Sequence, residues 1–146
     1  IANIMELQGY HKTYTVKDEH IDVQDIMDGL YYPFYMEDCR HAFIKDRLGF
    51  DLEEQARQGV NMVLSKYTIS FFRSLRRGDE FAVTCELYKD PSGQPKLHMV
   101  QHILKNGKKY TTGVFTGTCV KSTGGRPFLP GGLGELLKDA PVLEAE

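Results

Sequence analysis

Three aspartates in one short segment have the residue type and spacing for acid–base chemistry. Asp22, Asp25 and Asp28 alternate with bulky apolar residues within residues 18–29, directly before a segment with helical periodicity. Carboxylates in front of a helix ordinarily act as caps, because they accept hydrogen bonds from the free N–H groups of the first turn. Alternatively, one carboxylate acts as a base or nucleophile while those N–H groups polarise a carbonyl oxygen. The residues alone favour the capping role.

Other candidate chemistry has less support. His98 and His102 share one side of a predicted strand, but no third ligand accompanies them, so we predict no metal site. The chain lacks a Gly-x-Ser-x-Gly motif, which argues against a serine hydrolase. The glycine clusters at 124–125 and 131–134 do not follow a strand and open a helix, as a phosphate-binding loop would.

The length and composition predict one globular domain over residues 1–146. The chain has 146 residues, and domains average about 150 residues. An apolar content of 41% is enough for a core. We expect residues 1–6 to be a tag or a disordered segment, and residues 131–146 to form a tail that is either a short helix or disordered.

The charge and the cysteines exclude several classes of protein. With 18 Lys+Arg against 20 Asp+Glu, the net charge of −2 gives no field that would attract nucleic acid. No apolar run approaches the ~18 residues of a membrane span, and no leader peptide is apparent, so we expect a cytoplasmic protein without membrane partners. Cys39, Cys85 and Cys119 form no Cys-x-x-Cys pair, which predicts reduced packing residues.

A long apolar helix is predicted at 30–48. Tyr32, Met36 and Cys39 recur at i, i+4 and i+7, and Gly49 follows as a stop signal. Polar residues at 51–58 suit one or two further helical turns.

Five segments have the alternating pattern of half-buried strands. They cover 10–16, 63–71, 80–87, 97–105 and 110–120. The dipeptide at 106–107, Asn-Gly, predicts a two-residue hairpin. The order of one strand, one helix and four strands predicts an α+β protein in which a curved antiparallel sheet covers the helix.

These residues resemble a known family. Asp22, then Tyr32 ten residues later, then Phe-Tyr-Met-Glu-Asp-Cys-Arg at 34–40, resembles the 4-hydroxybenzoyl-CoA thioesterase branch of the hotdog-fold superfamily. Gly-Asp at 78–79 and Arg-Pro-Phe-Leu-Pro at 126–130 resemble later parts of the same pattern. The resemblance implies a hotdog fold, which is a curved five-stranded antiparallel sheet wrapped around one central helix (β-α-β-β-β-β). It also implies a homo-oligomer, either a dimer or a dimer of dimers.

The resemblance implies an acyl-CoA thioesterase. Asp22 matches the family's catalytic aspartate, which acts as general base or nucleophile. The backbone N–H of Gly29 matches the helix-start amide that hydrogen-bonds the thioester oxygen. Coenzyme A enters as part of the substrate, so the resemblance implies no separate cofactor.

The remaining site residues follow from the same resemblance. Tyr31, Tyr32 and Phe34 are expected to face the acyl group, and Arg76 and Arg77 to supply cations for the phosphates of coenzyme A. The structural alternative is that the three aromatic residues only pack in the core and that the two arginines belong to a solvated turn.

The loop departs from the family at three positions. Asp25 replaces a common Gly, Asp28 a common Asn or aromatic residue, and Gly29 a common His or Asn. The additional carboxylates would repel an anionic acyl group, so we expect a neutral aliphatic or aromatic acyl-CoA. Glu37 is expected to point away from the apolar side of the helix into a structural salt bridge.

Two alternatives stay open. An acyl carrier protein could deliver the acyl group in a biosynthetic pathway, or the protein could bind acyl thioesters without hydrolysing them.

Overall fold

The computed structural model describes residues 9–144, so the expectation for residues 1–6 lies outside the described part of the chain. The elements are β1 (His11–Thr15), the 3-10 turn η1 (Asp18–His20), α2 (Tyr31–Asp46), α3 (Leu52–Arg57), β2 (Val60–Phe71), β3 (Glu80–Thr84), β4 (Glu86–Lys89), β5 (Leu97–Lys105), β6 (Lys108–Lys121) and α4 (Gly131–Lys138). The predicted order of one strand, one long helix and further strands is confirmed.

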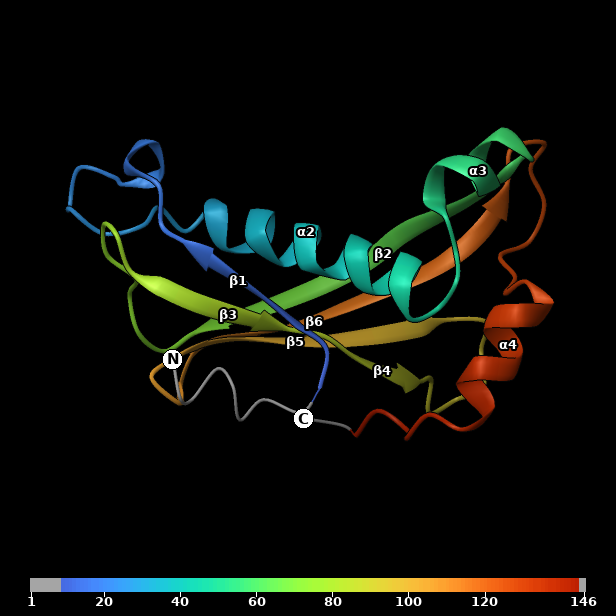
Figure 1. The fold of residues 1–146 in the computed structure, drawn as a ribbon. Coiled ribbons are helices and arrows are strands. Elements are labelled where there is room, and N and C mark those ends of the chain that lie inside the picture. Colours follow the sequence, from blue (N-terminus) through green and yellow to red (C-terminus); the bar gives the residue numbers. More distant parts are fainter. Residues whose placement is uncertain (1–8, 145–146) are drawn as a thin grey trace.

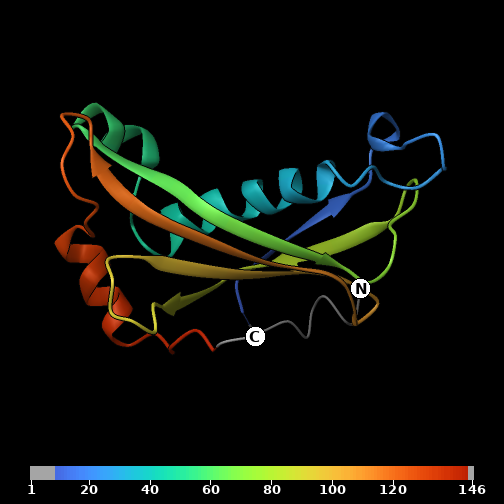
Figure 2. The ribbon, with the colours of Figure 1, turned by 180° about the vertical axis from the view of Figure 1, so that it is seen from behind.

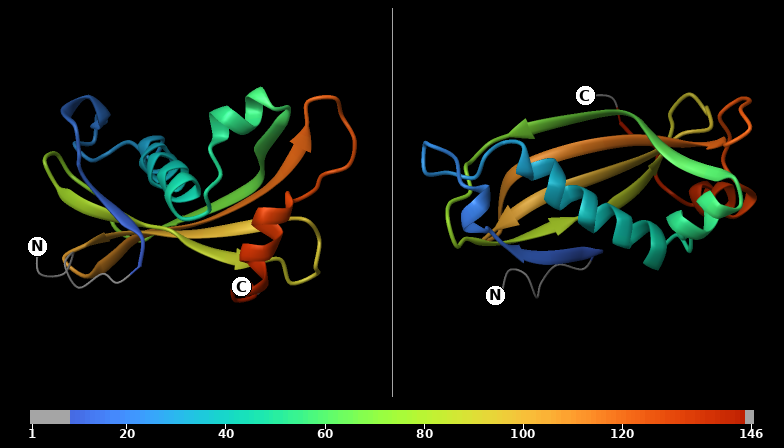
Figure 3. Two further views of the ribbon diagram at one scale, coloured as in Figure 1. Left: turned by 45° about the vertical axis from the view of Figure 1, so that its right-hand side comes forward. Right: turned by 90° about the horizontal axis from the view of Figure 1, so that it is seen from above.

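One curved antiparallel sheet holds all the strands. They pair in the order β1-β3-β5-β6-β2, and β4 pairs with β5. Figure 1 shows α2 lying along the hollow side of this sheet, and the two views of Figure 3 show the sheet curving around it. This arrangement is the predicted α+β architecture of a hotdog fold.

The apolar side of α2 packs on the centre of the sheet. Met36 and Cys39 are fully buried there, as their spacing predicts. Gly113 of β6 permits the close approach, because a Cβ at this position would lie 3.2 Å from the Met36 sulfur. The helix ends at Asp46, two residues before the predicted end, and Gly49, with φ of +64°, turns the chain just beyond it.

The predicted strand at 80–87 is broken. β3 and β4 are separated at Cys85, whose N–H donates to the Tyr10 carbonyl oxygen at 3.1 Å. Ala82 is fully buried, although the alternating pattern predicted that it faces away from the core. The five expected strands are therefore six, because one of them is interrupted at Cys85: both parts pair with β5, and β3 also pairs with β1.

β2 differs most from its sequence-based description. It was predicted to be half-buried, but it forms an edge of the sheet, pairing only with β6 (Figure 2). Val63, Leu64, Tyr67 and Phe71 are exposed on it. Alternation of apolar residues cannot tell whether the covering surface belongs to the same chain.

The segment after β6 is partly helical. α4 buries Leu133 and Leu137, and beyond it Val142 forms a bridge with Lys89 at the end of β4. This is the short-helix alternative expected for the tail; the glycine cluster at 131–134 opens α4 but does not directly follow a strand.

The three cysteines are packing residues, as predicted. Cys39, Cys85 and Cys119 are all buried and free, and burial raises the pKa of Cys39 and Cys119 to about 11.

Across residues 9–144 no helix combines the length and apolarity needed to cross a bilayer.

Candidate active site

The acidic loop between η1 and α2 is a closed turn. Ile21 and Met27 form a bridge, and the Asp22 N–H donates to the Ile26 carbonyl oxygen at 2.8 Å. At its tip Asp25 has φ of 65°, in the left-handed region that few side chains adopt. The loop therefore has a defined shape before any ligand binds.

Two buried hydrogen bonds fix this loop to the core. The Met27 N–H donates to the Leu75 carbonyl oxygen at 2.8 Å, and the Leu75 N–H donates to the Tyr32 hydroxyl at 3.0 Å. Burial raises the pKa of the Tyr32 hydroxyl, and the Asp22 charge raises it further. Tyr32, predicted to face the acyl group, is only 3% exposed and is not among the residues that line the grooves described below. It positions the loop from underneath.

The N–H of Gly29, just before α2, is free within the described residues. Asp28 accepts from the Leu30 N–H through its carboxylate at 2.9 Å and from the Tyr31 N–H through its carbonyl at 3.0 Å. This is the predicted capping role. Between these groups, the N–H of Gly29 donates to no acceptor in residues 9–144, and Gly29 is exposed. An N–H group in this position is suited to a developing negative charge.

The Asp22 carboxylate has few partners. It is half-buried, and its one hydrogen bond within the described residues comes from the Gln24 N–H at 2.8 Å. A carboxylate has about four acceptor positions, so most of them are open. Asp22 shares this openness with Asp28, whose carboxylate also accepts one hydrogen bond, from the Leu30 N–H, whereas the Asp25 carboxylate is paired with Arg77.

Arg77 holds the outside of the loop. Its guanidinium lies 3.1 Å from the Asp18 carboxylate and 3.2 Å from that of Asp25. Hydrogen bonds to these two carboxylates raise the pKa of Arg77. Arg77 therefore pairs with two carboxylates of the loop, which the sequence did not predict. Arg76 is exposed, and its backbone N–H donates to Asp79 at 2.8 Å.

A groove of about 380 Å³ begins at the start of α2 and runs between α2 and β2. Tyr31 and Phe34 line it, as do Tyr67 and Phe115 from the facing strands. Tyr31 is stacked on His20 with ring centroids 3.9 Å apart. The structure thus brings two of the three predicted acyl contacts together on one wall.

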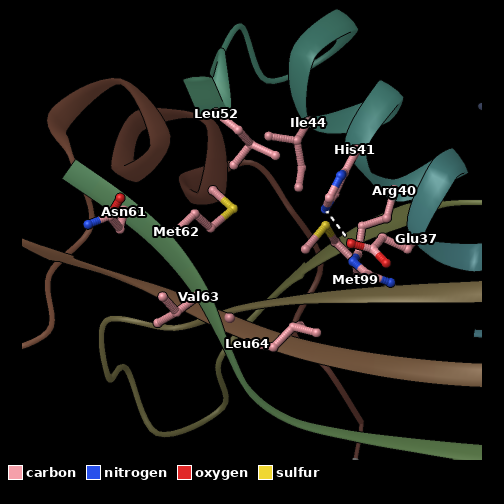
Figure 4. Close-up of a pocket in the computed structure, with 11 residues that line it drawn as sticks. Glu37, Arg40, His41, Ile44, Leu52, Asn61, Met62, Val63, Leu64 and Met99 are labelled. Carbon is pink, nitrogen blue, oxygen red and sulfur yellow. Dashed lines mark ion pairs between the residues drawn. The ribbon is translucent and has the colours of Figure 1, made fainter. Parts of the chain in front are cut away.

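A second groove of about 420 Å³ continues along the same helix toward α3. Figure 4 shows Ile44 and Leu52 above it and Val63 and Leu64 on β2 below. Glu37 is exposed and its carboxylate lies 3.5 Å from His41 Nε2, which agrees with the expected structural contact, and it also borders both grooves.

Sequence reasoning did not single out Arg40, which lines both grooves. It is 4% exposed, its guanidinium lies 4.2 Å from the centre of the Phe115 ring, and burial lowers its pKa. The signal was present in the sequence, because Arg40 follows Met36 by four residues and so shares the apolar side of α2.

The two histidines of β5 are structural. His98 Nε2 lies 2.8 Å from the Asp90 carboxylate, and its Nδ1 lies 2.8 Å from the Thr116 hydroxyl. His102 Nδ1 lies 2.8 Å from the Thr112 hydroxyl. No group of three potential metal ligands occurs among residues 9–144.

Comparison with known proteins agrees with this fold. An acyl-acyl carrier protein thioesterase of Arabidopsis thaliana chloroplasts, ATL3, is 31% identical over 72 residues, which are 49% of this chain and 37% of that protein. The chain thus spans little more than a third of the length of this relative.

Solved structures cover more of the chain. Protein SAV2348 of Staphylococcus aureus, solved in complex with CoA, superposes with a TM-score of 0.79 at 21% identity, over 95% of this chain and 90% of that chain. A 1,4-dihydroxy-2-naphthoyl-CoA thioesterase of Synechocystis gives a TM-score of 0.76 at 12% identity, over 89% and 96% of the two chains. At these identities the likeness concerns the fold. The model of the thioesterase-like superfamily matches residues 16–141, and the chain belongs to that superfamily.

Proposed function

We propose that this protein hydrolyses the thioester of a neutral aliphatic or aromatic acyl-CoA. The observation that carries the proposal is the pairing, on one rigid loop, of the open Asp22 carboxylate with the unused Gly29 N–H. The proposal is also supported by membership of the thioesterase-like superfamily. Two of the similar proteins are named as a CoA thioesterase and an acyl-carrier-protein thioesterase.

In the proposed reaction the thioester carbonyl oxygen accepts a hydrogen bond from the Gly29 N–H. Asp22 either takes a proton from an attacking water or attacks the carbonyl carbon itself. In both routes the oxygen gains negative charge, which one well-placed N–H stabilises by ~3–4 kcal/mol in the transition state. The C–S bond then breaks, and coenzyme A leaves as its thiol with a proton from Asp22 or from solvent. In the base route the fatty or aromatic acid forms directly from the attacking water. In the nucleophile route a water must hydrolyse the mixed anhydride with Asp22 before the acid is released and the Asp22 carboxylate is restored.

The charges of the loop support a neutral acyl group. Arg77 already pairs with Asp18 and Asp25, but the carboxylates of Asp22 and Asp28 have no such partner within residues 9–144 and would lie close to the thioester. An acyl group ending in a carboxylate would meet their repulsion. Arg76 is left as the exposed cation on this turn and would contact the phosphates of coenzyme A.

The open β2 edge supports assembly into a homodimer or a dimer of dimers. This 12-residue strand pairs along one edge with β6, its other edge has no partner strand among the described residues, and its faces carry exposed apolar side chains. Exposed strand edges of this kind invite pairing with another strand. Because both grooves lie between α2 and β2, a second copy on this edge would cover them and complete the acyl site.

An acyl carrier protein is the second candidate carrier, because the matched plant relative is named for that substrate. Parallel assays with acyl-CoA and acyl-carrier-protein thioesters separate the two. A protein that only binds acyl thioesters would release no free thiol from either.

The test is release of free thiol from short, medium, long-chain and aromatic acyl-CoAs, with Asp22→Asn assayed beside the parent protein. We expect Asp22→Asn to lose 10²–10⁴-fold in turnover while its fold and assembly persist. Asp139→Asn is the matched control, since Asp139 is exposed at the end of α4. Full activity of Asp22→Asn would assign the base to another carboxylate of the loop or to Glu37.

A further inference from the structure

Arg40 is a buried cation without a carboxylate partner. Of its five N–H donors, the one with a partner among the described residues is on Nη1, which donates to the Gln101 side-chain oxygen at 3.1 Å. The Gln101 amide N–H in turn donates to the Met36 carbonyl oxygen at 2.9 Å, so Gln101 is held in place. No ion pair within residues 9–144 includes Arg40. Burying a guanidinium is unfavourable unless its donors find acceptors.

The place of Arg40 shows where an acceptor could arrive. Arg40, Glu37 and Leu64 border both grooves, so Arg40 lies where one groove passes into the other. The first groove starts at Leu30 and Tyr31, beside the proposed thioester position. Ten residues of helix separate Leu30 from Arg40, a rise of ~15 Å, and helical side chains lean toward the N-terminus. Its guanidinium therefore lies several carbons beyond a thioester held at Gly29.

The surroundings on both sides of Arg40 are mostly apolar, although Glu37 borders both grooves and His41 and Asn61 border the second. Phe34 and Phe115 line the first groove, and Ile44, Met62 and Met99 line the second. Figure 4 shows Arg40 and Met99 together below α2, with Leu64 across from them. A ligand that fills both grooves is thus an apolar chain that meets hydrogen-bond donors partway along.

The charge near Arg40 favours a neutral acceptor. The carboxylate of Glu37 borders the same two grooves and acts electrostatically on Arg40. It supplies a compensating negative charge without a hydrogen bond. A second carboxylate would meet repulsion from Glu37, whereas a hydroxyl or carbonyl oxygen would accept from Arg40 without that penalty.

We propose that Arg40 is a specificity-determining residue that recognises a neutral oxygen partway along an otherwise apolar acyl group. The preferred substrates are then oxygenated acyl thioesters, with a hydroxyl or carbonyl several carbons beyond the thioester. This inference rests on the proposed thioesterase function and adds the chemical class of its acyl group.

The test is a scan of hydroxyl position. Dodecanoyl-CoA is compared with forms hydroxylated at successive carbons, from the third to the terminal one. We expect kcat/KM of the parent protein to peak about 10-fold above dodecanoyl-CoA at one position. Arg40→Met keeps the length of the side chain over Phe115 and removes the donors, so the peak disappears while dodecanoyl-CoA is still hydrolysed. Arg40→Lys, which keeps the charge and has fewer donors, retains part of the peak.

Arg47→Met is the matched control. Arg47 lies at the end of α2, 5.1 Å from the centre of the Tyr10 ring, and lines neither groove. It should leave the scan unchanged. A flat scan in the parent protein, or an unchanged peak in Arg40→Met, would overturn the inference. So would an Arg40→Met protein that loses its oligomeric state with no change in the scan, because Arg40 would then serve the subunit contact.

Calorimetric binding of the same ligands to Asp22→Asn separates this inference from the function it rests on. If the parent protein releases no thiol but hydroxylated ligands bind more tightly than dodecanoyl-CoA in an Arg40-dependent way, hydrolysis fails and the role of Arg40 stands. If hydrolysis occurs and neither binding nor turnover depends on the hydroxyl, the role of Arg40 fails alone.

Discussion

Asp22 and Asp90 begin similar turns but have opposite surroundings. Each carboxylate accepts a hydrogen bond from the N–H two residues later, from Gln24 at 2.8 Å and from Ser92 at 3.1 Å. For Asp22 the bonding among the described residues ends there. Asp90 also accepts from the Ser92 hydroxyl, the Gln94 N–H at 3.2 Å and His98 Nε2 at 2.8 Å.

The difference separates a structural carboxylate from one available for chemistry. Hydrogen bonds from Ser92, His98 and Gln94 lower the pKa of Asp90 to about 2, although its burial opposes this. Its acceptor positions are filled, so it cannot take a proton or attack a carbonyl without breaking the turn. Of the two carboxylates, the one with more hydrogen bonds is therefore the structural one. A reactive carboxylate needs a fixed backbone and unfilled acceptor positions, which is the state of Asp22.

The largest expected effect comes from removing each carboxylate in turn. Asp90→Ala leaves His98 and two N–H groups without their acceptor, so the free energy of unfolding should fall by about 3 kcal/mol. Asp22→Ala loses one hydrogen bond and should change it by less than about 1 kcal/mol. Urea unfolding of both variants measures this. Equal losses would mean that the two turns are equally important to the fold.

A smaller effect is expected from acid, which should lower the free energy of unfolding through protonation of Asp90. The pKa of Asp90 is lower in the folded protein than its usual 3.8, so its contribution to stability is complete above about pH 4 and is lost as the pH falls toward about 2. We expect this loss to be on the order of 1 kcal/mol. Urea midpoints at pH 5 and near pH 2.5 measure it, with Asp90→Asn as reference. The comparison fails if the variant loses as much stability over this range as the parent protein does.

The smallest expected effect tests how freely Asp22 works. Arg77→Gln removes the cation that pairs with Asp18 and Asp25, which lie in the same loop as Asp22. The ion pairs are exposed, so the melting temperature should not change. The acidic limb of the kcat/KM profile should move to higher pH and lower the rate there by about 3-fold. Arg57→Gln, which breaks an exposed pair with Glu54 on α3, should leave the profile as it is.

Local signals predicted most of the fold. Gly49 and the periodicity of Met36 and Cys39 located α2, and Asn106 and Gly107 located the hairpin that joins β5 to β6. These signals act through backbone conformation and side-chain spacing within a few residues. The position of β2 at an edge depends on contacts far apart in sequence, so its alternating residues predicted a buried face that one chain alone does not provide.

For the candidate site, too, the local features were predictable from the sequence and the contacts with distant residues were not. The acidic loop, the capping role of Asp28 and the groove contacts of Tyr31 and Phe34 follow from the place of the loop before the helix. Tyr32 turned inward because Leu75, more than 40 residues later, supplies the N–H that its hydroxyl accepts. Arg77 likewise required knowledge of which loop its turn approaches. Catalytic roles for Asp22 and Gly29 stay predictions until they are assayed.

The pairing of β1 has a consequence for how the protein is made. β1 leaves the ribosome before the other strands of this sheet, but its partner strand β3 comes about 70 positions later. The turn that holds the acidic loop through Leu75 is also synthesised after α2. A nascent chain that ends before β3 thus carries every residue of the acidic loop without the strands that order it. Hydrolytic competence should therefore arise late in synthesis, when the last antiparallel pairs close around the helix.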